Sequence, residues 1–145
     1  MSEPEQVVEE IVYPELTDYE IDVFNALCPA MDTLVPEGNF RSEKTPVLES
    51  LPVCTFCRMD SMPDWNHEST SDFEDYTIES YEANVYALTM EECKKIMNTL
   101  AERLRQMNFR RLSMRPVDNV NDQRIQRIVA RFEIKIDNTG QMFRT

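Results

Sequence analysis

The sequence predicts an α+β fold in which one long helix packs on a small, mainly antiparallel sheet of three or four strands. Apolar residues recur at helical spacing over residues 90–107 and alternate with polar residues over much of 109–144. Seven of the eight prolines fall in residues 1–63, where they disfavour long regular elements. We therefore expect an α+β core over residues 83–145, preceded by a proline-rich, acidic half over residues 1–82 that is partly extended or mobile.

A short helix is predicted inside the acidic half. Thr17 and Glu20 have the spacing of a capping box, in which each side chain binds the backbone N–H of the other residue. Apolar residues then recur at helical spacing, at Ile21, Phe24, Leu27 and Cys28. Pro29 is expected to end this helix, because proline cannot donate a helical hydrogen bond.

The remainder of the acidic half shows no sustained periodicity. Residues 31–63 carry isolated apolar residues between prolines, and we expect them to lie extended over a surface. Residues 64–82 form an acidic run with serines and tyrosines and few aliphatic residues. Burial of so few apolar groups would not offset the entropy cost of ordering, so a mobile loop is expected there.

The core is predicted to begin with a short strand over residues 83–88. Thr89 and Glu92 form a second capping box, and a helix is expected from about residue 90 to residue 107. Its apolar stripe consists of Ile96, Met97, Leu100, Leu104 and Met107.

Three further strands complete the predicted sheet. Residues 109–117 alternate until proline interrupts them, and residues 128–137 alternate without a fault. The start of the second segment also fits a helix, but the alternation is longer and favours a strand. Gly140 permits a tight turn because glycine readily adopts a positive φ, and residues 141–144 return as the last strand.

Charge is divided unevenly along the chain. The net charge is −12, yet residues 1–92 hold 22 acidic and 3 basic side chains, whereas residues 93–145 hold 5 acidic and 12 basic ones. The net charges of these two parts are therefore −19 and +7. This asymmetry predicts either two binding surfaces of opposite sign or two halves that lie against each other.

The composition also excludes classes of function. Phosphate-cradling loops need several neighbouring glycines, and the only glycines, Gly38 and Gly140, stand alone. No apolar stretch approaches the length of about eighteen residues that crosses a bilayer, and residues 1–5 are acidic where a signal peptide would be basic. We expect a cytoplasmic or nuclear protein with reduced cysteines and no membrane partner. No nucleophile motif accompanies the single histidine, so no enzymatic activity is expected.

The principal functional hypothesis concerns the short helix. Ile21, Phe24 and Leu27 lie on one face between acidic residues, as in helices that bind a hydrophobic groove with a basic rim. The same stripe is equally consistent with packing on the chain's own sheet. On the first interpretation the protein is a non-catalytic adaptor or subunit of a larger intracellular assembly, and its protein partner has a basic or grooved surface.

Nucleic-acid binding through a basic sheet face is an alternative. With regular alternation, Arg127, Arg131 and Lys135 line one face of the sheet, and Arg111 and Arg115 join them. Such a face would contact phosphates, but no solvent-facing aromatic pair is predicted that could stack bases. The net charge of −12 opposes this interpretation through long-range repulsion of phosphate.

A third hypothesis is a small zinc-stabilised binding module. Cys54 and Cys57 have the spacing of half a zinc site, and His67 is a candidate third ligand. A second close pair of ligands is missing, and the two cysteines are also consistent with small apolar residues beneath a loop. Apart from this possible zinc ion, no cofactor is expected.

Overall fold

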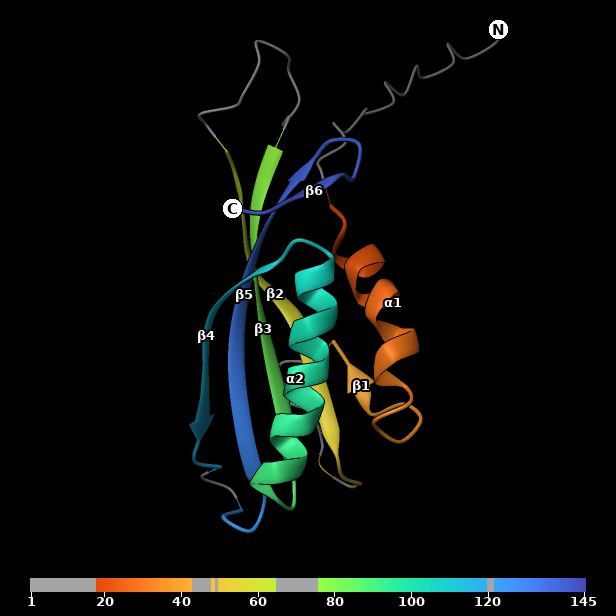
Figure 1. Cartoon of the computed structure of the whole chain (residues 1–145), viewed down its shortest axis with the longest axis vertical. Helices are drawn as coiled ribbons and strands as arrows, with labels where there is room; N and C mark the ends of the chain where they lie inside the picture. The colour runs from red at the N-terminus through yellow and green to blue at the C-terminus, as the bar shows by residue number, and fades with distance from the viewer. Residues whose placement is uncertain (1–17, 43–47, 49, 65–75, 120–121) are drawn as a thin grey trace, which may run out of the picture.

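A computed structural model of the chain describes residues 18–42, 48, 50–64, 76–119 and 122–145. In this part, two neighbouring helices cover one face of a six-stranded sheet (Figure 1). The helices are α1 (Glu20–Met31) and α2 (Met90–Gln106). The strands are β1 (Phe40–Arg41), β2 (Val53–Pro63), β3 (Tyr76–Ala87), β4 (Arg110–Val117), β5 (Gln126–Asp137) and β6 (Met142–Phe143).

The sheet is larger than predicted, and it is mixed. Its strand order is β1-β2-β3-β5-β4, and β6 pairs with β5 beyond the end of β4. β1 runs parallel to β2, whereas the other neighbouring pairs are antiparallel. The prediction of three or four mainly antiparallel strands is therefore wrong. The additional strands come from the half of the chain that was expected to be extended or mobile.

Two features of the sequence conceal β2 and β3. Residues 53–57 of β2 are all buried, so this end of the strand has no alternation between apolar and polar positions. β3 does alternate in burial, but polar Thr77 and charged Glu79 occupy two of its buried positions. Alternation identifies a strand only where the buried face is apolar, and here it is not.

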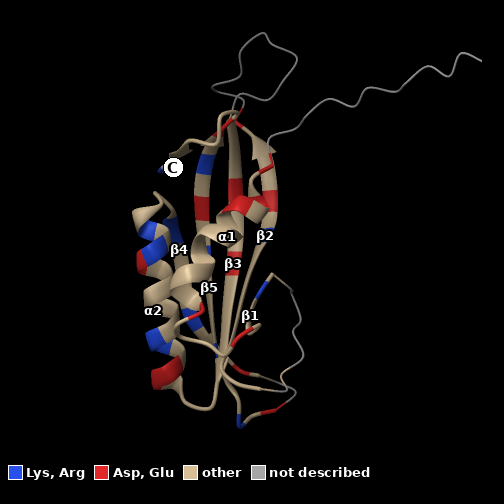
Figure 2. Cartoon of the chain, turned by 90° about the vertical axis from the view of Figure 1, so that its right-hand side faces the viewer, with Lys and Arg blue, Asp and Glu red and all other residues tan. Residues whose placement is uncertain are grey.

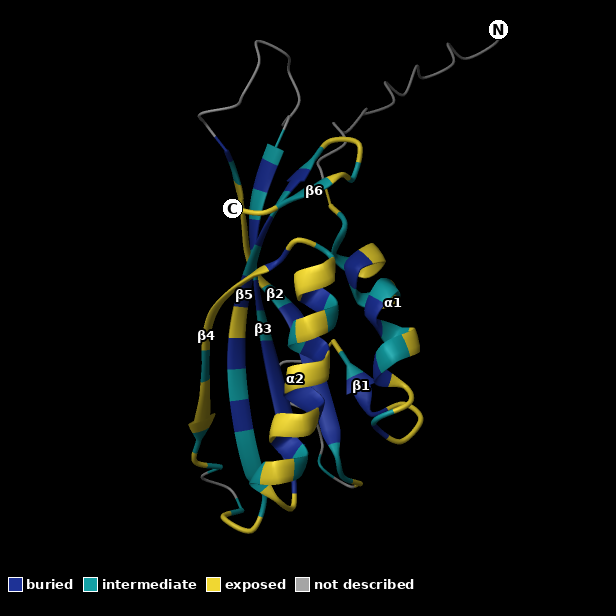
Figure 3. Ribbon diagram, viewed as in Figure 1, coloured by how far each residue is buried: buried dark blue, intermediate teal, exposed yellow. Residues whose placement is uncertain are grey.

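The expected division between residues 82 and 83 falls inside β3. This strand pairs along its length with β2 on one side and with β5 on the other. The buried cluster beneath the helices combines Val23 and Leu27 of α1 with Leu100 of α2 and Ile134 of β5 (Figure 3). The described residues therefore share one hydrophobic core.

The long helix is confirmed, with Met90–Gln106 close to the predicted bounds. Thr89 caps it, because its side-chain oxygen accepts a hydrogen bond from the backbone N–H of Glu92 at 3.2 Å. The apolar stripe lies on the sheet, with Ile96, Leu100 and Leu104 buried. Neither of the described helices combines the length and apolar composition that crossing a membrane requires.

The short helix differs from its prediction in phase and in length. Thr17, the predicted cap, lies outside the described residues, and Tyr19 at the N-cap position makes no side-chain capping bond. Pro29 lies inside the last turns, and the helix continues to Met31. The buried residues are Val23, Leu27 and Met31, at intervals of four, so the face that meets the core is rotated from the predicted stripe.

The end of the sheet follows the prediction closely. β5 alternates between buried and partly exposed residues, and Gly140 has a φ of +88° in the turn before β6. A Cβ atom at Gly140 would lie 3.0 Å from the ring of Tyr19, so a side chain would meet both a strained backbone and a close neighbour. The turn thus holds the start of α1, and the Tyr19 hydroxyl donates a hydrogen bond to the backbone oxygen of Asn138 at 3.1 Å.

Candidate functional site: an arginine-lined cavity

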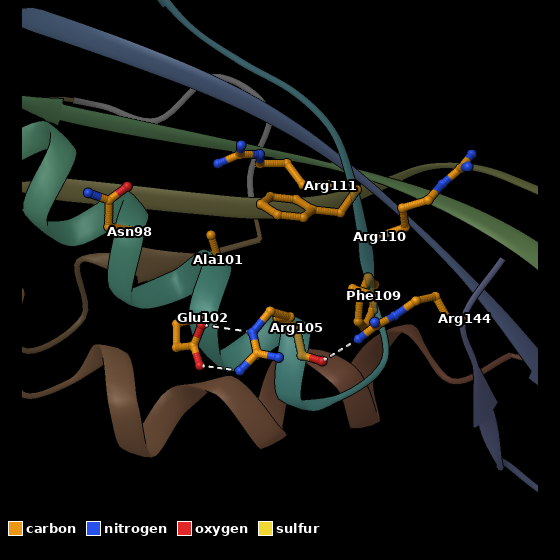
Figure 4. A pocket seen from close by; sticks show the side chains of 9 residues that line it. Asn98, Ala101, Glu102, Arg105, Phe109, Arg110, Arg111 and Arg144 are labelled. Carbon is orange, nitrogen blue, oxygen red and sulfur yellow. Dashed lines mark hydrogen bonds and ion pairs between the residues drawn. The ribbon is translucent and has the colours of Figure 1, made fainter.

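A cavity of about 500 Å³ lies between α2 and the edge strand β4 (Figure 4). Four arginines line it: Arg105 from α2, Arg110 and Arg111 from the start of β4, and Arg144 from the segment after β6. In Figure 4, Arg111 reaches from β4 toward α2, whereas Arg110 is directed away. Two consecutive elements, α2 and β4, and the distant segment after β6 thus bring guanidinium groups to one opening.

The apolar part of the cavity is aromatic and firmly packed. Phe109 and Phe132 contribute to its lining although each side chain is almost fully buried. The ring of Phe109 makes edge contacts with Tyr81 at 5.5 Å and with Phe56 at 6.4 Å. The two rings therefore support the cavity from beneath and expose almost no surface to it.

Two of the four arginines are neutralised by carboxylates of the same chain. Arg105 donates two hydrogen bonds to Glu102, at 2.9 and 2.7 Å, and these bonds lower the pKa of the Glu102 carboxyl below its ordinary value. Arg110 pairs with Glu133 at 3.0 Å on the far side of the sheet. Both pairs are solvent-exposed and contribute little to stability.

The other two arginines have no carboxylate partner among the described residues. Arg144 donates to the backbone oxygen of Arg105, at 3.3 Å. Arg111 places its Nη1 4.0 Å from the sulfur of Met114. Within the described part of the chain, the cavity thus presents two guanidinium groups that no carboxylate neutralises, and guanidinium binds carboxylates and phosphates through paired N–H groups.

A β-bulge at Leu112 directs Arg111 into this cavity. The register between β4 and β5 shifts between Arg111 and Ser113. Arg111 consequently lies opposite Phe132, on the helix-covered face, whereas Arg115 lies opposite Val129 on the other face. Regular alternation would have placed both arginines on the same face, as the sequence predicted.

The predicted basic face is therefore divided, and most of its cations on the open face already have partners. Arg131 pairs with Glu82 at 3.3 Å and Lys135 with Asp64 at 2.9 Å. Arg127 donates two hydrogen bonds to the side-chain oxygen of Asn84, at 3.0 and 2.7 Å, and lies over the ring of Tyr86. Of this set, only Arg115 and Arg111 lack an acidic or amide partner within the described residues.

The structure separates the candidate zinc ligands. Cys54 lies opposite Val85 on the helix-covered face, and Cys57 lies opposite Glu82 on the other face. Residues three apart on a strand point in opposite directions, so these thiols cannot hold one ion. Burial also raises the pKa of the Cys54 thiol, which disfavours the thiolate that a metal needs. His67 lies outside the described residues, and the described ones contain no cluster of three potential ligands.

The three predicted partner-binding residues occupy different environments. Leu27 is fully buried in the core. Phe24 is half-buried, with its ring stacked on Phe40 at a centroid distance of 4.6 Å. Ile21 is 74% exposed and is the most accessible of the three.

An ionic cluster centred on the buried Glu79 joins α1 to the sheet, and no pattern in the sequence predicted it. Arg58 of β2 contacts Glu79 of β3 at 3.1 Å, Asp18 at 2.8 Å and Glu20 at 3.5 Å. Tyr81 donates a hydrogen bond to Glu79 at 2.9 Å. Burial raises the pKa of Glu79, although the bonds from Tyr81 and Arg58 oppose this effect. Glu79 is fully enclosed, so we assign this cluster a structural role.

Comparison with models of known protein families finds no match, and comparison with curated protein sequences finds no relative. The site must therefore be judged on its geometry. Of the four cavity arginines, only Arg111 is among the binding residues predicted from the sequence. The sequence does contain a signal for a cationic site, namely four arginines close together at the junction between helix and strand: Arg103, Arg105, Arg110 and Arg111.

Proposed function

We propose that this chain is a non-catalytic subunit of a larger assembly that binds an acidic segment of a protein partner in the arginine-lined cavity. One observation carries the proposal: Arg111 and Arg144 face an aromatic-walled cavity without any described carboxylate to neutralise them. A partner's carboxylates would supply the missing charge, and its apolar side chains would meet the accessible apolar lining, which includes Ala101.

An acidic protein segment fits this site better than a nucleic acid does. The two phenylalanines are 2% and 1% exposed, so neither presents a ring face on which a base could stack. The cations of the open sheet face are largely paired within the chain. The net charge of −12 also repels a polyphosphate at long range, whereas a short peptide brings few charges.

Direct binding of a labelled peptide tests this proposal. The probe is a fluorescein-labelled peptide of glutamates with one central phenylalanine, titrated with the full chain and followed by fluorescence anisotropy. We expect saturable binding that weakens with salt, and about a tenfold loss of affinity in Arg111→Ala, because one charge-assisted hydrogen bond contributes about 1.5–3 kcal/mol.

Lys95→Ala is the matched control. It removes one positive charge from the exposed side of α2, outside the cavity lining, and should leave the affinity nearly unchanged. Equal losses in both variants would mean that the peptide senses only the overall charge. Tighter binding of a single-stranded oligonucleotide, lost in Arg115→Ala and retained in Arg111→Ala, would favour nucleic-acid binding at the open face instead.

A further inference from the structure

The described residues separate charge across the width of the sheet (Figure 2). Up to Ala87 they include nine acidic and two basic side chains, and from Leu88 onward they include seven acidic and twelve basic ones. Because the strand order is β1-β2-β3-β5-β4, the first group lies toward one border of the sheet and the second toward the other. The molecule therefore has an acidic and a basic side.

The basic edge consists of Arg110, Arg111, Leu112 and Arg115. All four belong to β4, which pairs only with β5 among the described strands and is exposed along most of its length. Leu112 is 48% exposed at the bulge, so the edge presents apolar surface between its cations. The arginine-lined cavity opens beside this edge on the helix-covered face.

The acidic edge consists of Ile21, Asp22, Met59, Asp60 and Met62. The last three lie on β2 beyond its short pairing with β1, and the first two lie on the first turn of α1. Arg58 holds this turn against β2, because its backbone N–H donates to Glu20 at 3.3 Å and its side chain binds Asp18. Ile21, Met59 and Met62 are 74%, 45% and 48% exposed, so this edge also mixes charge with apolar surface.

The two edges are arranged so that one copy of the chain can meet another. β2, β3, β5 and β4 alternate in direction, so β4 runs antiparallel to β2. A row of paired residues runs from Arg110 through Glu133 and Ser80 to Asp60, which places the two charged ends at one level. Both helices lie on the same face, so a neighbour in the same orientation brings its α1 beside the cavity next to α2.

Like charge disfavours the symmetric alternatives. Two basic edges placed together would bring Arg111 and Arg115 of one copy near the same arginines of the other, and two acidic edges would oppose their carboxylates. Contact between unlike edges pairs opposite charges and covers Leu112 with the exposed methionines. An interface between two different surfaces of the same chain is head to tail, and each added copy leaves one edge of either kind free.

We infer that the acidic segment bound at the basic edge is the acidic edge of a second copy, so that copies of this chain associate head to tail. The inference rests on the proposed function and names its partner. The assembly is then a ring or an open chain of copies, because a two-fold dimer pairs the same edge of both copies and leaves the other edge unused.

Sedimentation velocity of the full chain is the first test. We expect species larger than a monomer at about 0.01 M salt, where the screening length is ~30 Å, and dissociation at about 1 M salt, where it is ~3 Å. Arg111→Glu on the basic edge and Asp60→Arg on the acidic edge should each give monomers. Lys95→Glu and Glu37→Arg reverse the same charges at exposed positions outside both edges, and should associate as the unmodified chain does.

Mixing the two edge variants distinguishes this arrangement from others. Arg111→Glu retains its acidic edge and Asp60→Arg retains its basic edge, and the two reversed edges are again opposite in charge, so an equimolar mixture should associate although each variant alone does not. A symmetric interface predicts no such complementation. If either reversal prevents folding, as judged by circular dichroism, the milder pair Arg111→Gln and Asp60→Asn replaces it.

Two outcomes separate this inference from the proposed function. A chain that stays monomeric at low salt and high concentration, yet still binds the glutamate peptide through Arg111, overturns head-to-tail association and leaves a different protein as the partner. A monomeric chain that does not bind the peptide overturns both. Association that survives both edge reversals would place the contact elsewhere and overturn the inference as well.

Discussion

Two charged side chains depart from what their neighbours in sequence suggest. Glu79 lies in a strand of mixed composition, and yet its carboxylate is fully enclosed between Arg58 and Tyr81. Arg111 lies on an exposed edge strand and faces the helix side because of a single extra residue at Leu112. Neither placement has a local sequence signal, since one depends on a partner twenty-one residues away and the other on a bulge without glycine.

Glu79→Gln should change how stability depends on pH. The pKa of Glu79 is raised above its ordinary value of 4.5, so the folded chain retains this proton longer than the unfolded chain does. The stability that protonated Glu79 provides is complete below pH 4.5 and is lost as the pH rises through the raised pKa. Glutamine keeps the neutral form at all pH values, so the loss should disappear.

Urea denaturation from about pH 4.5 to about pH 7.5 measures this effect. The free energy of unfolding of the variant, relative to that of the unmodified chain, should increase over this range and then level off. Asp18 does not interfere, because hydrogen bonds from the Glu20 N–H and from Arg58 outweigh the effect of burial and lower its pKa. A constant difference between the two proteins would contradict a raised pKa at Glu79.

At the scale of elements, the predictable parts are those with a complete local pattern. α2 combines a cap at Thr89 with an uninterrupted apolar stripe, and β5 alternates over its length. α1 was correctly predicted as a helix, but the wrong face was expected to be apolar. The buried residues include Val23 and Met31, whereas the predicted stripe contained Ile21 and Phe24. β2 and β3 lack such a local pattern, and each is identified as a strand only by its pairing with the other.

Two truncations in α1 separate its core face from its exposed face. Leu27→Ala should lower the free energy of unfolding by about 2–5 kcal/mol, because it leaves a cavity beneath the helix. Ile21→Ala should change it by less than about 0.5 kcal/mol, since this side chain is exposed. Urea unfolding followed by circular dichroism measures both, and equal effects would mean that α1 does not pack on the sheet as described.

For the whole molecule, the expected start of the core at residue 83 falls within a strand. The sequence predicts an α+β core over residues 83–145, and in the structure β3 crosses residue 83 and pairs with β2 and β5. The many prolines and acidic residues of the first half predicted extended or mobile segments, but β2 and β3 form there nevertheless. Of the candidate site, only Arg111 was anticipated, since convergence of Arg105, Arg111 and Arg144 is a property of the fold.

A fragment of residues 83–145 should therefore fail to fold. It lacks α1, β2 and the first half of β3, and so exposes the surface of α2 and β5 that these elements cover. Thermal denaturation followed by circular dichroism should show no cooperative transition. A fragment of residues 18–145 retains all the described elements and should unfold cooperatively; a cooperative transition in the shorter fragment would restore the expected boundary.

The central position of β3 also governs how the protein can form during synthesis. The ribosome releases β2 and β3 directly after α1 and β1, and α2 and β4 must follow before β5 is available to pair with the second edge of β3. Until then the nascent hairpin offers an unpaired edge and an uncovered apolar face, both of which favour aggregation. Tyr19 reaches its bond with Asn138 later still. The elements that are made early thus depend on β5 and on Asn138, so the fold is stable only after the ribosome has released both.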